Sequence, residues 1–289
     1  MGLYSLRYPG FRIKALTLSY DDGRSEDIRL VDILNRYGIK GTFNINSGRF
    51  NGYSPRPKRP DGSEYYLTVE QMKELFLPAG HEIATHTVTH PMPSQLADGG
   101  AAWEFAHDRE TLEEMTGTIV RGMAYPYGAP DDRMVESARQ CGLAYGRVTE
   151  RTLGFSLPQD WLRWRPTCHH SEPKLETLCQ RFLAANRPWQ LQLFYLWGHS
   201  YEFADNDNWE LIENFCKTMG GHEDIWYATN MEIYNYVNAA RQLQTSMDGS
   251  RLYNPTATTI YLRTGGENVV LRAGEENVIV PPSQTIKID

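Results

Sequence analysis

The stretch that decides the fold is Leu16-Thr17-Leu18-Ser19-Tyr20-Asp21-Asp22-Gly23. Its first residues are mostly apolar, β-branched or aromatic, and they lead directly into two adjacent carboxylates and a glycine. This pattern predicts a buried strand whose C-terminal end delivers Asp21 and Asp22 to a loop, where Gly23 allows a sharp turn. Two neighbouring carboxylates raise each other's pKa unless a positive charge lies between them. Asp-Asp-Gly also suits a plain solvated turn, so a functional interpretation depends on the rest of the chain.

Strand and helix patterns alternate over the first 245 residues of the chain. Seven or eight strand-helix units in one run predict an α/β protein built on a parallel (β/α) barrel of about seven strands, complete or distorted. The alternative is an open doubly wound sheet, but no Gly-x-Gly-x-x-Gly phosphate turn follows any predicted strand. The predicted strands are residues 16–20, 41–46, 81–85, 120–125, 143–148, 191–197 and 225–228.

The pattern changes near residue 250. Three short strand-like runs, residues 258–263, 268–271 and 277–280, are separated by glycine-containing turns. We therefore expect residues 1–245 to form the barrel and residues 250–289 to form a small β-rich C-terminal extension. These three short strands are too few to form a sheet that is stable on its own. We expect them to dock on the barrel or on a second subunit, which would make the protein a homo-oligomer.

Composition narrows the classes of partner. The formal net charge of −7 and the sequence pI near 5.7 give no reason to expect nucleic acid or an anionic membrane as a partner. No apolar run approaches the ~20 residues that span a bilayer. The first residues lack the apolar segment of a signal peptide, so a cytoplasmic location is expected. The scattered cysteines predict neither a zinc knuckle nor a disulfide framework: Cys141, Cys168, Cys179 and Cys216.

The segment His86-Thr87-Val88-Thr89-His90-Pro91 places two histidines four residues apart. Imidazoles with this spacing can converge on one metal ion from a helix. Here the β-branched residues and Pro91 disfavour a helix, so a loop or single turn must bring the rings together. With Asp22, the two histidines would complete a three-ligand set with open positions for water and substrate, as in a hydrolytic zinc site.

Polar residues follow the ends of several predicted strands. Asp21 and Asp22, His86, Tyr127 and His199 each come just after a different strand. In parallel barrels the C-terminal rim of the strands carries the chemistry. His199, behind an apolar strand and a glycine, suits a general acid because its pKa lies near neutrality. The adjacent His169 and His170 should point apart in an extended segment, so we do not expect them to be joint ligands.

Four short motifs occur in order within a region that extends from about residue 14 to residue 240, which is most of the chain. Together they resemble the motifs of the polysaccharide deacetylases, carbohydrate esterase family 4. The motifs are Thr17-Leu18-Ser19-Tyr20-Asp21-Asp22-Gly23, Gly80-His81-Glu82-Ile83-Ala84-Thr85-His86-Thr87-Val88-Thr89-His90-Pro91, Tyr125-Pro126-Tyr127-Gly128 and Leu196-Trp197-Gly198-His199.

This resemblance implies a distorted (β/α) barrel and a role for each motif residue. A divalent metal, usually zinc, would be held by Asp22, His86 and His90. Asp21 would be the general base that activates water, and His199 the general acid for the departing amine. The backbone N–H of Tyr127 would help to hold the oxyanion.

The chain departs from the family pattern at two places. Many members carry a base-orienting arginine three residues before the Tyr127 position, where this chain has Ala124. The candidates to replace it are Arg121, Arg163 and Arg165. The aspartate-tryptophan motif that tunes the acid has only Asp160-Trp161 as a counterpart.

Three functions are consistent with these residues. The leading hypothesis is a metal-dependent hydrolase of C–N bonds that removes acetyl from an N-acetylated sugar or polysaccharide. The second is a C–N hydrolase of a small non-sugar amide. The third is an inactive carbohydrate-binding relative, suggested by the aromatic residues Trp161, Trp164 and Trp197. Tyr127, Trp161 and Trp197 are the candidate substrate-binding residues, although for each tryptophan taken singly a core or barrel-wall position is the better expectation.

Overall fold

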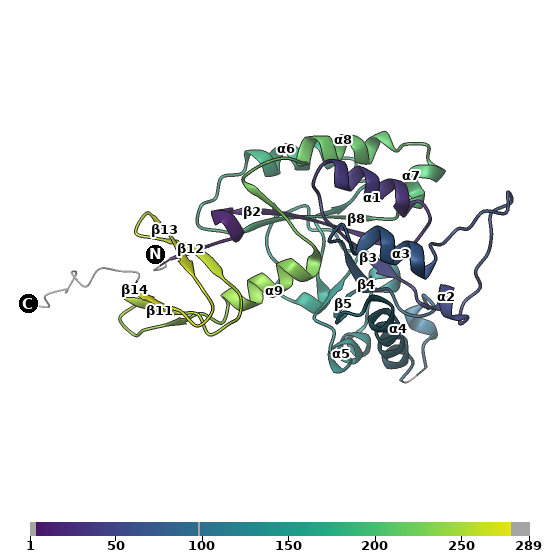
Figure 1. The fold of residues 1–289 in the computed structure, drawn as a ribbon, viewed down its shortest axis with the longest axis horizontal. Coiled ribbons are helices and arrows are strands. Elements are labelled where there is room, and N and C mark those ends of the chain that lie inside the picture. Colours follow the sequence, from purple (N-terminus) through teal and green to yellow (C-terminus); the bar gives the residue numbers. More distant parts are fainter. Residues whose placement is uncertain (1–3, 98, 279–289) are drawn as a thin grey trace, which may run out of the picture.

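The computed structural model describes residues 4–97 and 99–278. One curled sheet of parallel strands forms the centre, helices cover its outside, and short strands near the C-terminus form a separate layer (Figure 1). The strands are β1 (Ser5–Arg7), β2 (Lys14–Asp21), β3 (Gly41–Ile45), β4 (Glu82–Thr85), β5 (Gly122–Ala124), β6 (Tyr145–Arg147), β7 (Cys168–His169), β8 (Gln192–Gly198), β9 (Ile225–Tyr227), β10 (Gln244–Thr245), β11 (Arg251–Tyr253), β12 (Ile260–Thr264), β13 (Glu267–Leu271) and β14 (Glu276–Val278). The helices are α1 (Asp27–Arg36), α2 (Gly48–Asn51), α3 (Val69–Phe76), α4 (Gly100–Thr116), α5 (Asp132–Gln140), α6 (Leu175–Ala184), α7 (Tyr201–Asp205), α8 (Glu210–Met219) and α9 (Asn230–Ala240).

The central sheet confirms the predicted fold class. Its strand order is β6-β5-β4-β3-β2-β8-β7, and every pairing along it is parallel. β6 and β7 stand at its two ends, so the barrel is distorted rather than regular. β9 also pairs with β2, along residues 14–16, where β2 extends beyond β3. The C-terminal ends of β2, β3, β4 and β8 therefore lie together on one rim.

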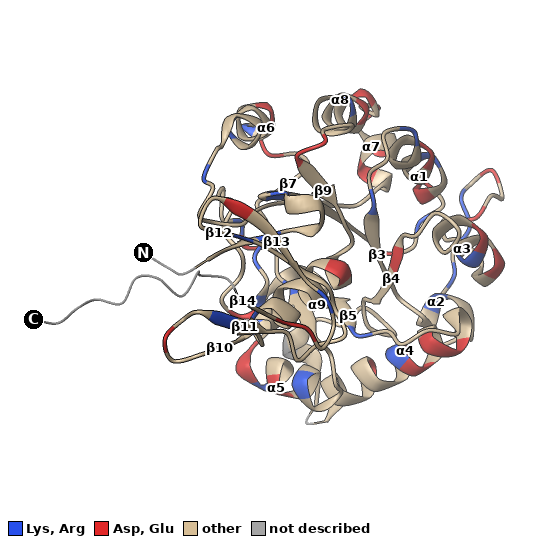
Figure 2. Ribbon diagram, turned by 60° about the vertical axis from the view of Figure 1, so that its left-hand side comes forward, with Lys and Arg blue, Asp and Glu red and all other residues tan. Residues whose placement is uncertain are grey.

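Burial explains why β2 lies at the centre. All eight of its residues are buried, as expected for a parallel strand covered on both faces. On the outer face Leu16, Leu18 and Tyr20 join a core cluster with residues of α1, α3, α6 and α8. Many of the charged residues lie on the outer helices (Figure 2). No described helix is both long and apolar enough to cross a membrane.

Helix α9 begins against a polar patch on the sheet. The backbone N–H groups of Asn230 and Met231 donate to Thr42 Oγ1 at 3.0 Å and to Glu82 Oε2 at 2.8 Å. Thr17 Oγ1 donates to the Asn230 side chain at 2.8 Å. The first N–H groups of a helix have no partner within the helix. Side chains of β3 and β4 supply partners for two of these groups, and Thr17 of β2 holds the Asn230 side chain, so the sheet helps to fix where α9 starts.

The C-terminal strands form two small sheets, β1-β12-β13 and β10-β11-β14. Because β1 pairs with β12, the beginning of the chain takes part in the same sheet as residues 260–271. The division into residues 1–245 and 250–289 stays a prediction, and residues 279–289 of the predicted extension lie outside the described residues. The tip of the predicted strand at residues 277–280 lies there as well.

Apolar side chains attach these strands to the barrel. Leu252, Ile260, Leu262 and Leu271 are fully buried in one cluster with barrel residues that include Ile233 and Tyr236 of α9. The Tyr236 hydroxyl also accepts a hydrogen bond from the Tyr261 N–H at 3.0 Å. Burial of each such aliphatic side chain is worth roughly 1.5–3 kcal/mol. Residues of β11, β12 and β13 thus share one core cluster with α9, which is called the second core cluster below.

Deleting residues 251–289 should expose this cluster. We expect the melting temperature to fall by roughly 10 °C or more, because several kcal/mol of apolar burial are lost, or the truncated protein to associate through the exposed surface. Thermal melting and the solution mass of the truncated and full chains test this. A truncated chain with unchanged melting and mass would show that these strands contribute neither to the core nor to a subunit contact.

Candidate active site

The predicted rim residues occur on turns with unusual backbone geometry. Asp22, His90 and Tyr127 have positive φ angles of 81°, 55° and 58°, and Thr87, between the two histidines, has a φ of 70°. Non-glycine residues rarely adopt this left-handed region, which costs about 1–3 kcal/mol for each residue. Such strain is concentrated at functional sites, where surrounding contacts hold it. The polar rim therefore carries backbone strain that the rest of the fold must offset.

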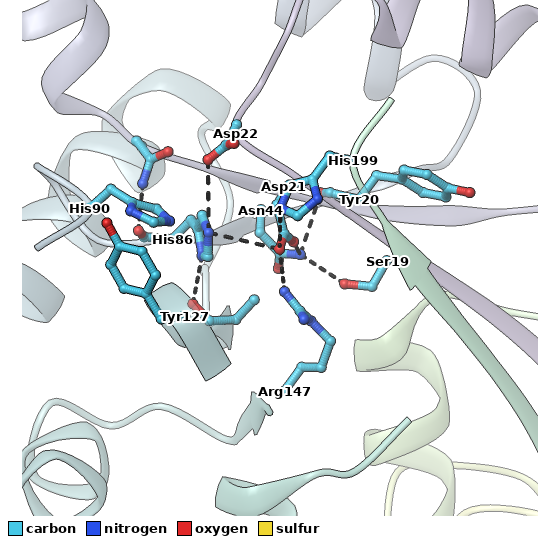
Figure 3. Close-up of polar contacts among 12 residues, drawn as sticks. Ser19, Tyr20, Asp21, Asp22, Asn44, His86, His90, Tyr127, Arg147 and His199 are labelled. Carbon is cyan, nitrogen blue, oxygen red and sulfur yellow. Dashed lines mark hydrogen bonds and ion pairs between the residues drawn. The ribbon is translucent and has the colours of Figure 1, made fainter. Parts of the chain in front are cut away.

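Asp22, His86 and His90 converge at this rim (Figure 3). One ligand atom from each lies within 4.8 Å of the others, and His86 Nε2 is 3.8 Å from Asp22 Oδ1. His86 Nδ1 lies 2.7 Å from the Ala124 carbonyl oxygen. That oxygen can only accept, so Nδ1 carries the proton and Nε2 presents its lone pair toward the carboxylate. Metal-binding histidines usually have such a backbone partner, so the three side chains fit a divalent cation.

Asp21 is held differently from Asp22. It is almost fully buried, it pairs with the equally buried Arg147, and it accepts a hydrogen bond from Asn44 Nδ2 at 2.8 Å. Burial opposes ionisation, but Arg147, with the nearby His86 and His199, holds the pKa of Asp21 below its ordinary value. His86 Nε2 is 3.8 Å from the nearest oxygen of both aspartates. Because Asp21 is already engaged, Asp22 has the carboxylate that is available to a metal.

Arg147 is the basic residue that the sequence interpretation missed. None of the three predicted arginines meets Asp21: Arg121 donates to the Gly142 carbonyl, and Arg163 and Arg165 pair with acidic residues near them. Arg147 ends β6, inside the predicted strand 143–148. Its position at a strand end was the signal that could have identified it.

His199 lies beside Asp21 and is held by Glu202. His199 Nδ1 is 3.0 Å from Glu202 Oε1, and its Nε2 is 3.8 Å from Asp21 Oδ2. Burial disfavours the imidazolium, but Glu202 and Asp21 together raise the pKa of His199 above its ordinary value. The predicted partner Asp160 lies elsewhere: it caps a short 3₁₀ turn through Leu162 N–H and pairs with Arg163. Glu202, on the short helix α7, supplies the carboxylate beside His199.

The expectation that His169 and His170 point apart is wrong. Their ring centroids are 4.3 Å apart, and both Nε2 atoms approach Glu202 Oε2, at 3.2 and 2.8 Å. β7 ends at His169, so the strand alternation stops there and the next side chain turns to the same side. Glu202 thus contacts His169 and His170 with one oxygen and His199 with the other.

His169, His170 and Glu202 form a second group whose ligand atoms lie within 4.8 Å of one another. Two observations favour a hydrogen-bonded cluster over a metal site here. His170 Nδ1 is buried without a partner, whereas a ligating histidine normally donates its second N–H to an acceptor. The Glu202 carboxylate is also engaged by three imidazoles, which hold its pKa far below its ordinary value despite burial. Asp22, His86 and His90 are therefore the better candidate for a metal site.

The aromatic candidates are placed differently from one another. Tyr127 is 53% exposed, and its ring centroid is 4.8 Å from that of His90, so it borders the site. Trp197 packs beneath the Arg147 guanidinium at 4.2 Å and next to His169. Trp161 is buried in the second core cluster, against Trp164 and Tyr234. The structure thus brings Tyr127 and Trp197 to the site and leaves Trp161 in the core.

Residues 10–146 of this chain match the sequence model of the family described as polysaccharide deacetylase. This part of the chain is similar to the polysaccharide deacetylases. The deacetylase match includes Asp21, Asp22, His86, His90 and Tyr127, and it ends just before Arg147.

Individual proteins and solved structures are similar to parts of this chain. Chitin deacetylase 1 of Cryptococcus neoformans var. grubii is 29% identical over 127 residues, 44% of this chain and 24% of that protein. The chain thus spans about a quarter of the length of that relative. A Mycobacterium smegmatis structure described as a polysaccharide deacetylase has a TM-score of 0.56 at 15% identity, covering 83% of this chain and 96% of that one. A Streptococcus pyogenes deacetylase solved with acetate has 25% identity and a TM-score of 0.41, covering 46% and 55%. The M. smegmatis likeness supports the barrel fold.

Proposed function

We propose that the protein is a divalent-metal-dependent hydrolase that removes an acetyl group from an N-acetylated sugar or polysaccharide. The observation that carries the proposal is the arrangement around Asp21. An ionised carboxylate, held by Arg147, lies between a three-residue metal site and His199. The deacetylase family match over residues 10–146 supports an acetylated sugar as the substrate class. Zinc is the metal that a set of two imidazoles and one carboxylate suits well.

Each residue has a distinct part in this proposal. A metal held by Asp22, His86 and His90 would polarise the acetyl carbonyl and lower the pKa of water. Asp21 accepts a proton from the attacking water, which requires the ionised form that Arg147 favours. His199, protonated on Nε2, donates a proton to the departing amine. The backbone N–H of Tyr127 stabilises the oxyanion, and its exposed ring forms one side of the substrate site.

Acetate release tests the proposal directly. Protein stripped of metal and reloaded with zinc should release acetate from N-acetylated oligosaccharides, and the stripped protein should not. Activity confined to small non-sugar amides would exclude the sugar substrate, and zinc binding without hydrolysis of either class would exclude a hydrolase.

We expect Glu202 to influence how the activity varies with pH. Besides Glu202, the groups that face His199 are Asp21 on β2 and the rings of His169, Trp197 and Tyr201. Glu202→Gln keeps an acceptor for Nδ1 but removes the negative charge, so the pKa of His199 should fall. Because the acid must be protonated, the basic limb of kcat/KM should move to lower pH.

A pH–rate profile of the variant, beside that of the wild type, measures this shift. Glu210→Gln, an exposed glutamate on α8, is the matched control and should leave the profile unchanged. An unchanged basic limb in Glu202→Gln would mean that Glu202 does not set the protonation of His199.

A further inference from the structure

The segment that carries the two metal-binding histidines is strained and lacks glycine. Thr87 and His90 adopt φ angles of 70° and 55°, and Thr87 is β-branched, for which this region is a genuine outlier. Thr87 and Val88 are fully buried. The segment's own sequence therefore does not favour the conformation that it adopts. Contacts from elsewhere in the fold must hold it.

One set of these contacts comes from Asp108 on α4. This fully buried carboxylate accepts hydrogen bonds from the Thr85 hydroxyl, from His86 N–H at 3.2 Å and from Ser47 N–H at 2.8 Å. The Thr85 hydroxyl in turn accepts a bond from Thr87 N–H at 3.2 Å. Asp108 thus fixes the start of the segment, including the backbone of the first histidine.

A second set comes from Glu104, four residues earlier on α4 and therefore on the same helix face. Glu104 is 5% exposed and accepts both the N–H and the hydroxyl of Thr89, at 2.9 and 2.6 Å. His90 N–H is bonded within the segment, to the Thr87 hydroxyl at 3.1 Å. Glu104 thus fixes the end of the segment, one residue before the second histidine.

Two buried carboxylates on one helix face are costly unless hydrogen bonds compensate them. Here the compensating donors all come from the segment and from Ser47, which lies just before α2. The carboxylates contact the backbone and the threonines of the segment rather than its imidazole rings. They are therefore suited to shape the metal site without being metal ligands.

We propose that Glu104 and Asp108 are positioning residues that hold residues 85–90 in the metal-binding conformation before a metal arrives. The inference rests on the proposed metal site of Asp22, His86 and His90. The physical basis is preorganisation of the site. If α4 did not hold the strained turns, part of the free energy of metal binding would be needed to form them. Loss of such supporting contacts typically lowers metal affinity by roughly 10–100-fold.

The test is the zinc affinity of Glu104→Gln. The glutamine amide has a single acceptor oxygen, so it can accept from only one of the two Thr89 donors, and it lacks the negative charge that strengthens both bonds. We expect zinc affinity to fall by about 10–100-fold, measured on metal-stripped protein by competition with a chromogenic chelator. Glu110→Gln, on the same helix but largely exposed, is the matched control and should bind zinc as the wild type does. Thr89→Val removes one donor at nearly constant shape and should weaken zinc binding in the same direction if Glu104→Gln folds poorly.

Thermal melting of the metal-free proteins separates positioning from general stability. A positioning role predicts a smaller zinc-induced rise in melting temperature for the variants than for the wild type at equal zinc concentration. Folded variants with a lower metal-free melting temperature but unchanged zinc affinity would overturn the inference. A wild-type protein that binds no zinc would instead overturn the metal site itself, so the two failures are distinguishable.

Discussion

Asp21→Asn should retain bound metal and lose turnover. Asparagine has nearly the shape of aspartate and can still accept a hydrogen bond from Arg147, but it cannot take a proton from water. General-base assistance is worth roughly 10²–10⁴ in rate, so kcat should fall by about that factor. The pKa of Asp21 is held low, so the wild-type carboxylate is ionised through neutral pH and protonates only in acid. The acidic limb that this titration produces should therefore be absent from the residual activity.

Asp22→Asn is the matched variant for this experiment. The two aspartates are adjacent, but Asp22 does not have the Arg147 and Asn44 contacts of Asp21. The Asp22→Asn protein should lose its bound metal, and its activity should fall as a consequence. Metal content, melting temperature and steady-state kinetics should be measured on both. Metal loss in Asp21→Asn with retention in Asp22→Asn would reverse the two roles, and full turnover in both would exclude a hydrolytic site.

Removing His86 should abolish stoichiometric metal binding. His86→Ala removes one of three protein ligands and leaves Asp22 and His90, too few for a stable divalent site of this kind. Metal content should fall well below one equivalent, measured by elemental analysis after purification with zinc and extensive dialysis. Circular dichroism should show that the fold is largely kept, because β4 and α4 do not depend on the imidazole.

Two histidine variants serve as controls. His169→Ala, in the Glu202 cluster, and His107→Ala, on the outer side of α4, should both keep one equivalent of metal. Full metal in His86→Ala would refute the assignment. Metal loss in His169→Ala would move the metal site to the Glu202 cluster.

Much of this architecture follows from local sequence patterns. Apolar strands alternating with amphipathic helices specify which surfaces are buried, and burial on both faces requires a parallel sheet covered by helices. The polar residues that end these strands then meet on one rim by geometry alone. Asp21, Asp22, His86 and His199 could therefore be identified without coordinates. So could the loop character of the histidine segment, because Pro91 and the β-branched residues disfavour a helix.

The partners of these residues were decided by tertiary structure. Arg147 reaches Asp21 across 126 positions of sequence, and only the order of the strands in the curled sheet brings β6 to face β2. Glu202 could not be assigned because α7 has five residues, too few to show a helical period. The α4 carboxylates resemble ordinary solvent-facing charges until the helix is packed on the histidine segment. Local sequence patterns indicate whether a residue is buried. Which charged side chains pair with one another depends on packing between segments that are distant in sequence. The contacts that support this site could therefore be identified only from the folded structure.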